Sequence, residues 1–124
     1  MKYIAIDFDG TVVTHDYPNI GSDIGAIPVL KQLIEKNYKL ILNTMRSGKE
    51  LRDAVSWFKK NEIPLFGINK NPTQSKWTDS PKVYAHLYID DAALGIPLIH
   101  DKINNRPYVN WVKVEKLLIQ RGIL

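Results

Sequence analysis

Short apolar runs alternate with amphipathic stretches along the chain, a pattern typical of an α/β protein with a parallel sheet. Residues 3–6 form an apolar run without helical periodicity, which predicts a strand buried on both faces. Similar runs predict further strands at 40–42, 66–68, 87–89 and 96–99. Helical periodicity predicts helices from about 27 to 37, 47 to 61 and 109 to 121. We therefore expect a single domain over residues 1–124, with a parallel sheet flanked by helices.

Local signals refine the ends of these elements. Pro28 suits the first turn of a helix, and Ser47 and Glu50 have the spacing of a capping box. Residues 12–25 are rich in glycine and polar residues, which predicts a loop with a short hairpin. The polar stretch 70–81 predicts a long loop over the carboxyl edge of the sheet.

Composition narrows the classes of protein that this chain can belong to. Hydrophobic residues make up 44% and charged residues 24%, as in ordinary soluble domains. The chain has no cysteine, which excludes disulfides, thiolate catalysis and a zinc ribbon. The first strand follows Met1 and Lys2 directly, and no apolar run approaches membrane-spanning length, so we expect a cytoplasmic protein without a membrane partner. The net charge of +4, with lysines spread along the chain, favours anionic substrates and gives weak support for nucleic acid.

Polar side chains follow three of the predicted strands, at the point where each strand ends. They are Asp7 and Asp9, Thr44, and Asp90 and Asp91. Because ligands of open α/β sheets bind at the carboxyl edge, we expect these groups to lie close together. Neighbouring buried carboxylates repel, and Mg²⁺ with its preference for oxygen ligands would remove that repulsion. The alternative is structural, since Asp-Gly is also a common turn dipeptide.

The run Asp7-Phe8-Asp9-Gly10-Thr11 resembles the nucleophile motif of the haloacid-dehalogenase (HAD) superfamily of phosphotransferases and phosphohydrolases. Thr44 is similar to the second motif, and Asp90-Asp91 resembles the fourth, metal-binding motif. The third motif is a single lysine. We favour Lys82, because Ser80-Pro81-Lys82 predicts a short helix aimed at the site, while Lys70 and Lys76 stay open as alternatives. The resemblance spans nearly the whole chain and implies a three-layer, Rossmann-like, HAD-like sheet.

The resemblance also implies the roles of the acids. Asp7 would attack phosphorus and form an aspartyl-phosphate, as carboxylates do in covalent phosphoryl transfer. Asp9 would protonate the leaving group and then activate water, while its backbone carbonyl binds the metal. Mg²⁺ would be held by Asp7, Asp9 and the pair Asp90 and Asp91, with Asp91 slightly preferred over Asp90 as the direct ligand of that pair.

Phosphate binding is expected from Thr44, from Lys82 and from backbone N–H groups around Gly10. Arg46 is a candidate substrate clamp, because a guanidinium matches phosphate geometry, and a surface arginine is an equally good interpretation. Among the histidines, His15 stands out because it follows the nucleophile loop. Trp77 lies in the polar loop and is a candidate substrate contact.

No cap domain fits between these motifs, so we expect an open site, covered by a large substrate or by a second subunit of a homo-oligomer. The substrate would be a phosphorylated group on a small molecule or a macromolecule, and capless relatives often act on macromolecules. The leading hypothesis is a Mg²⁺-dependent phosphomonoesterase. The alternatives are a non-catalytic phosphate-binding or phosphoacceptor module, similar to a signalling receiver, and an inactive relative that binds a partner.

Overall fold

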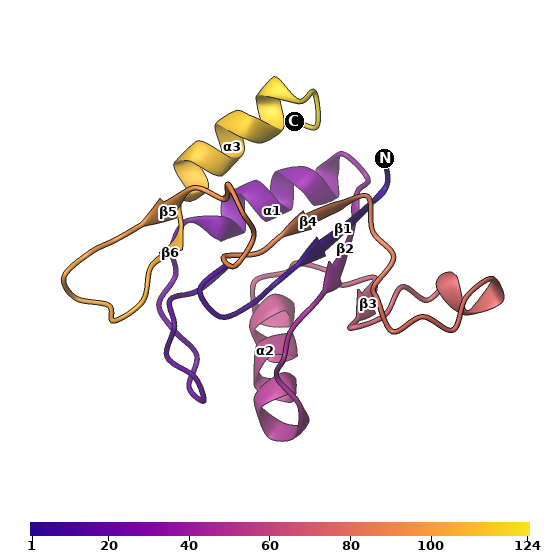
Figure 1. Cartoon of the computed structure of the whole chain (residues 1–124), viewed down its shortest axis with the longest axis horizontal. Helices are drawn as coiled ribbons and strands as arrows, with labels where there is room; N and C mark the ends of the chain where they lie inside the picture. Colours follow the sequence, from indigo (N-terminus) through magenta and orange to yellow (C-terminus); the bar gives the residue numbers. More distant parts are fainter.

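A four-stranded parallel sheet in the order β3-β2-β1-β4 forms the centre of the computed structural model, which describes all 124 residues (Figure 1). The strands are β1 (Tyr3–Ile6), β2 (Lys39–Leu42), β3 (Gly67–Ile68) and β4 (Leu87–Ile89). The predicted parallel sheet is therefore confirmed. The apolar run at 96–99 does not join it, because β5 (Leu98–Ile99) pairs antiparallel with β6 (Tyr108–Val109) in a separate ribbon.

Three helices accompany the sheet, near the predicted positions: α1 (Ala26–Glu35), α2 (Gly48–Lys60) and α3 (Trp111–Gln120). Pro28 lies in the first turn of α1, as predicted, and Asn37 follows the helix with a φ of 67°. Ser47 is the N-cap residue of α2, but its side chain makes no capping hydrogen bond, so the predicted capping box is wrong. Each helix is too short or too polar to cross a membrane.

The two faces of the sheet are covered differently. Ile4 and Ile6 point to the large core, which includes buried residues of α1, α2 and α3. Tyr3 and Ala5 point to the opposite face, where they pack in a small cluster with Ile41 and Val83. The residues packed around this cluster come from connections rather than helices: Phe66, Tyr84 and Ala85. The sheet thus has helices on one face only, which gives two layers instead of the three that we expected.

The connection from β3 to β4 covers that second face. Its only regular element is the three-residue 3-10 helix η1 (Gln74–Lys76), and Figure 1 shows this segment extending away from α1, α2 and α3. The short helix predicted at Ser80-Pro81-Lys82 does not form. Instead, the buried side chain of Gln74 donates to the carbonyls of Ser80 and Lys82, which holds the segment in an irregular conformation.

The loop after β1 contains the predicted short hairpin. Val13 and Asp23 form an antiparallel bridge, and the Thr14 N–H donates to the Ser22 carbonyl at 3.0 Å. Val13 also bridges to Asp9. The hairpin therefore lies against the end of β1, next to the acids that follow this strand.

Candidate metal and phosphate site

Three of the predicted acids meet at the carboxyl edge of β1 and β4. Ile6 pairs with Ile89, and the Asp7 N–H continues this ladder by donating to the Ile89 carbonyl at 3.0 Å. The residues that follow the two strands are therefore neighbours. Asp7, Asp90 and Asp91 each offer a carboxylate oxygen, and these oxygens lie within 4.8 Å of one another. This grouping confirms the expected proximity for Asp7, Asp90 and Asp91, but not for the Asp9 side chain.

The electrostatics of Asp7 fit a cation site. The pKa of Asp7 is raised from 3.8 to about 8, chiefly by burial and also by Asp90 and Asp91, while the Thr11 hydroxyl acts in the opposite direction. Burial and the neighbouring acids both disfavour the ionised carboxylate, so Asp7 holds a proton unless a cation binds. Three half-buried oxygen ligands on adjacent strands are the donor set that Mg²⁺ prefers, so the residues fit this ion.

Thr11 connects the acids that follow β1 and β4. Its hydroxyl donates to Asp7 Oδ2 at 2.7 Å and accepts the Asp91 N–H at 3.0 Å. The side chain is fully buried, and the turn that carries it is closed by Thr11 and Val12 N–H groups bonded to the Phe8 carbonyl. Thr11 therefore positions both the Asp7 carboxylate after β1 and the Asp91 backbone after β4.

The sequence indicates His15 only by its place after residues 7–11, and the structure gives it a partner among the acids. Its Nε2 lies 2.9 Å from Asp91 Oδ2. The imidazole packs over Gly10, where a Cβ atom would clash with Nε2. Because Gly10 also has a φ of 78°, no other residue fits this position without strain. The Gly10 N–H donates to the Val13 carbonyl at 2.8 Å, so it has a partner within the protein.

Asp9 faces away from the acidic cluster and forms an ion pair with Arg46. The guanidinium donates from Nε to Asp9 Oδ2 at 2.8 Å and from a terminal nitrogen to Oδ1 at 2.7 Å. This bidentate contact raises the pKa of Arg46. The Asp9 backbone carbonyl accepts no hydrogen bond, so it is free to serve as the predicted metal ligand.

All five N–H groups of the Arg46 guanidinium have partners within the chain. The remaining three bonds go to the carbonyls of Pro18, Asn19 and Glu50. The residue is only 3% exposed. As a substrate clamp, Arg46 would have to release one of these partners, so the structure favours a positioning role over direct phosphate binding.

Thr44 stands at the end of β2, on the edge that carries the acids. Its backbone N–H donates to Asn69 Oδ1 at 2.7 Å, and its hydroxyl accepts the backbone N–H of Arg46 at 3.2 Å. As an acceptor in this bond, the hydroxyl keeps its own proton for a phosphoryl oxygen. Asn69, which the sequence did not single out, follows β3 in the left-handed conformation with a φ of 54°.

The lysine of the predicted site is not paired with the acids. The Lys82 ammonium lies 5.7 Å from the centre of the Tyr88 ring and forms no ion pair. Lys70 and Lys76 are exposed and also form no ion pair. The choice among the three lysines stays a prediction.

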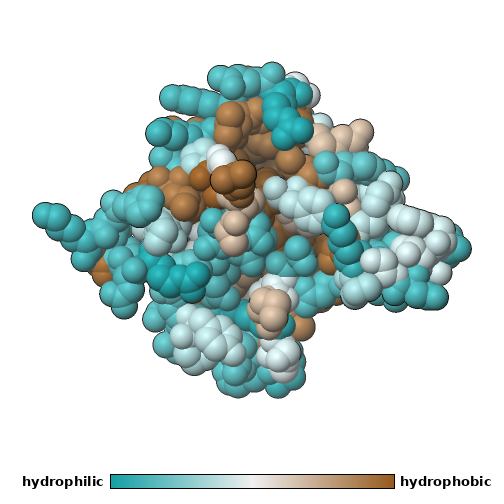
Figure 2. All heavy atoms as spheres, in the orientation of Figure 1, coloured by the Kyte–Doolittle hydropathy of each residue, from teal (hydrophilic) through white to brown (hydrophobic).

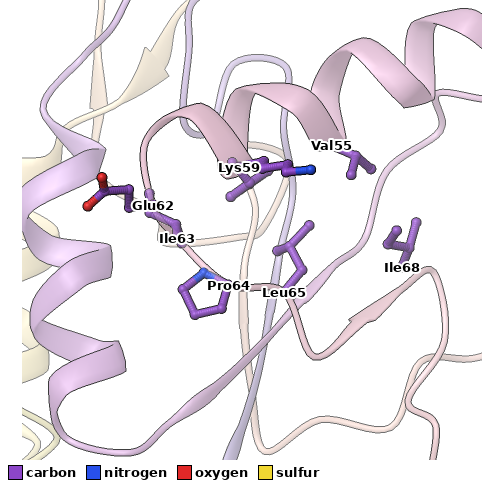
Figure 3. Close-up of a pocket in the computed structure, with 8 residues that line it drawn as sticks. Val55, Lys59, Glu62, Ile63, Pro64, Leu65 and Ile68 are labelled. Atoms are coloured by element: carbon purple, nitrogen blue, oxygen red, sulfur yellow. The ribbon is translucent and has the colours of Figure 1, made fainter.

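A mainly apolar cavity lies elsewhere. It measures about 550 Å³ and is lined by α2, the loop after it and β3, with mainly apolar residues such as Val55, Leu65 and Ile68 (Figure 3). β3 is at the opposite edge of the sheet from β4, with β2 and β1 between them. This cavity is therefore separate from the acidic cluster.

Fold and site together define an α/β protein with a Rossmann-like parallel sheet and an acidic cluster at its carboxyl edge. No family model and no curated protein matches the sequence. Among solved structures, the chain is similar to a conserved protein from Bacteroides thetaiotaomicron, with 33% sequence identity and a TM-score of 0.77. The match covers 96% of this chain and 90% of the other. The chain belongs to the same family as that conserved protein.

Proposed function

We propose that this protein is a Mg²⁺-dependent phosphohydrolase of the HAD type that acts on phosphate monoesters through an aspartyl-phosphate. The observation that carries the proposal is the convergence of Asp7, Asp90 and Asp91, with oxygens within 4.8 Å, at the carboxyl edge of a parallel sheet. The resemblance of residues 7–11 to the nucleophile motif of that superfamily supports the same chemistry.

In the proposed reaction, a carboxylate oxygen of Asp7 attacks phosphorus, and the bond from phosphorus to the leaving oxygen breaks. Water then attacks phosphorus, the bond to Asp7 breaks, and inorganic phosphate leaves with the carboxylate restored. Thr11 orients Asp7 through its 2.7 Å hydrogen bond. The Thr44 hydroxyl and the Lys82 ammonium would hold the phosphoryl oxygens.

Bound Mg²⁺ would neutralise the charge between an anionic nucleophile and an anionic ester. Asp7, Asp90 and Asp91 would hold it with their side chains, and Asp9 with its backbone carbonyl. Loss of the Asp7 proton accompanies formation of this site, because a protonated carboxyl is a poor ligand.

Asp9 is the proposed proton donor to the leaving group and the base for water. Both of its oxygens accept hydrogen bonds from Arg46, so each proton transfer through Asp9 requires that one of these bonds lengthen. Arg46 would then be a positioning residue that keeps Asp9 turned away from the metal.

Hydrolysis of 4-nitrophenyl phosphate with Mg²⁺ tests the proposal. Wild-type protein should turn over many times, and Asp7→Asn should be inactive. Asp79→Asn is the matched control, because Asp79 is exposed and forms no ion pair. Equal rates in Asp7→Asn and wild type would contradict the mechanism.

A phosphoacceptor module is the second candidate, and the Asp9–Arg46 pair favours it. If Arg46 keeps Asp9 from activating water, the aspartyl-phosphate persists instead of being hydrolysed. A stable phosphoryl group on Asp7, with one equivalent of leaving group released and no further turnover, would identify this function.

A further inference from the structure

A second cavity lies against the face of the sheet that has no helix. It measures about 330 Å³, at the lower end of small-molecule sites. Three aromatic residues of its wall are Trp77, Tyr84 and Tyr88, and three polar ones are Thr78, Ser80 and Lys82. No acidic residue lines it. In Figure 2 the part of the surface that carries the β3–β4 connection, at the right, is mostly teal to white, the colours of hydrophilic and intermediate residues.

The aromatic wall offers ring faces to a ligand. Trp77 is 63% exposed and Tyr88 is 39% exposed, although both belong to a cavity wall. Trp77 is braced by Tyr84, with ring centres 5.2 Å apart at 89°, and Tyr84 in turn packs on Tyr3 at 5.6 Å. An exposed indole held in place from one side is suited to stacking on the other.

The polar wall offers hydrogen-bond donors. The Thr78 hydroxyl accepts the Ser80 N–H at 3.1 Å, and the Ser80 hydroxyl accepts the Lys82 N–H at 3.2 Å. Neither hydroxyl proton is donated within the chain, and the Lys82 ammonium has no anionic partner. Two hydroxyl donors and one cation beside exposed rings fit a flat aromatic ligand that carries acceptor atoms and negative charge.

Hydrogen bonds of two buried amide side chains fix the conformation of this wall. Gln74 is buried and makes four hydrogen bonds: its oxygen accepts from Asn71 and Tyr84 N–H groups, and its nitrogen donates to Ser80 and Lys82 carbonyls. Asn71, also buried, donates to the Tyr84 carbonyl at 3.0 Å. The segment that carries the cavity is therefore ordered before any ligand binds.

The cavity and the acidic cluster lie on the same face of the sheet. Ile4, Ile6 and Phe8 belong to the large core, so the residues that alternate with them, Ala5 and Asp7, face the other side. Tyr88 pairs with Ala5, and Asp90 follows Tyr88 by two residues, a rise of roughly 7 Å along a strand.

We propose that this cavity binds the base of a nucleotide unit, stacked on Trp77 and bordered by Tyr88, whose phosphate points toward Asp7 and Asp90. The unit is a free mononucleotide or the phosphorylated end of a single strand, since both present the same chemistry. The proposal names the substrate class of the phosphohydrolase and rests on that function for the orientation of the phosphate, but the base site itself is measured without hydrolysis.

Binding is measured in EDTA, without Mg²⁺, by quenching of tryptophan fluorescence with acrylamide. Trp57 and Trp111 are 8% and 3% exposed, so the quencher reports mainly on Trp77. AMP should protect Trp77 from the quencher, and ribose 5-phosphate, which lacks a base, should not. A 5′-phosphorylated oligodeoxyadenylate distinguishes the two sources: tighter binding than AMP identifies a strand end, and weaker binding a free nucleotide.

Calorimetry with AMP tests the role of Trp77 in binding. Trp77→Ala should weaken binding by roughly five- to hundredfold, the effect of losing one base–aromatic stack. Trp77→Phe, which keeps a ring, should restore most of the affinity. Ile103→Ala is the matched control, because Ile103 is exposed on the β5–β6 loop outside the cavity. Circular dichroism confirms that each variant is folded.

Equal affinity for AMP and ribose 5-phosphate, unchanged affinity in Trp77→Ala, or phenyl phosphate binding as tightly as AMP would overturn the base site. These results leave the phosphohydrolase proposal intact if 4-nitrophenyl phosphate is still hydrolysed through Asp7. Conversely, AMP binding that depends on Trp77 in a protein without phosphatase activity supports the base site and rejects the hydrolytic function.

Discussion

Replacing Arg46 with alanine is expected to destabilise the fold strongly. The guanidinium is almost fully buried, holds both oxygens of Asp9 and binds three backbone carbonyls. It also lies 4.9 Å from the Phe8 ring centre. Removing one partner of a buried ion pair costs about 3 to 5 kcal/mol. The Asp9 side chain is 19% exposed, so water relieves part of its lost contact, and we place the loss at about 3 kcal/mol.

Because small domains are stable by only about 5 to 15 kcal/mol, this loss should be plain in urea unfolding followed by circular dichroism. Arg46→Lys keeps the positive charge but cannot make the bidentate contact with Asp9, so we expect it to recover only part of the stability. A double-mutant cycle with Asp9→Asn should give a coupling above about 1 kcal/mol. A loss of stability below about 1 kcal/mol in Arg46→Ala, with no coupling to Asp9, would refute this reasoning. It would mean that the contacts of Arg46 with Asp9, with the loop of residues 12–25 and with α2 contribute little to stability.

Three further predictions concern the acids. With its pKa near 8, Asp7 is protonated in the folded, metal-free protein at pH 7 but ionised in the unfolded chain. The free energy of unfolding should therefore fall as pH rises from about 4 to 8, which thermal melts can measure. Asp7→Asn should not show this fall. For the same reason, calorimetry in buffers of different ionisation enthalpy should detect release of about one proton on Mg²⁺ binding at pH 7; no release would contradict the raised pKa. Thr11→Val should raise the pKa of Asp7 further and weaken Mg²⁺ binding at pH 7, whereas Thr11→Ser should behave like wild type; equal affinities in all three would remove Thr11 from the site.

Much of the fold was predictable because β1, β2 and β4 are continuous apolar runs. Such runs predict strands of a parallel sheet, and the carboxyl ends of parallel strands share one edge. The meeting of Asp7 with Asp90 and Asp91 follows from that rule alone. The absence of a third layer was not predictable, because it depends on the polar segment after β3, whose backbone binds the Gln74 and Asn71 amides instead of forming a helix.

The partners of Asp9 and Asp91 could not be read from the sequence. Arg46 lies 37 residues from Asp9, and His15 lies 76 residues from Asp91. Each contact depends on how a loop and a helix start are placed in space. The sequence therefore identified Arg46 and His15 as candidates but gave no signal for which acid each one binds.

Intact-protein and peptide mass spectrometry after incubation with acetyl phosphate and Mg²⁺, followed by an acid quench, tests the central claim most directly. We predict a single phosphoryl group on the peptide that contains Asp7, absent from Asp7→Asn and absent when EDTA replaces Mg²⁺. A phosphoryl group on another residue, or turnover of a phosphate ester with Asp7 never modified, would contradict the account.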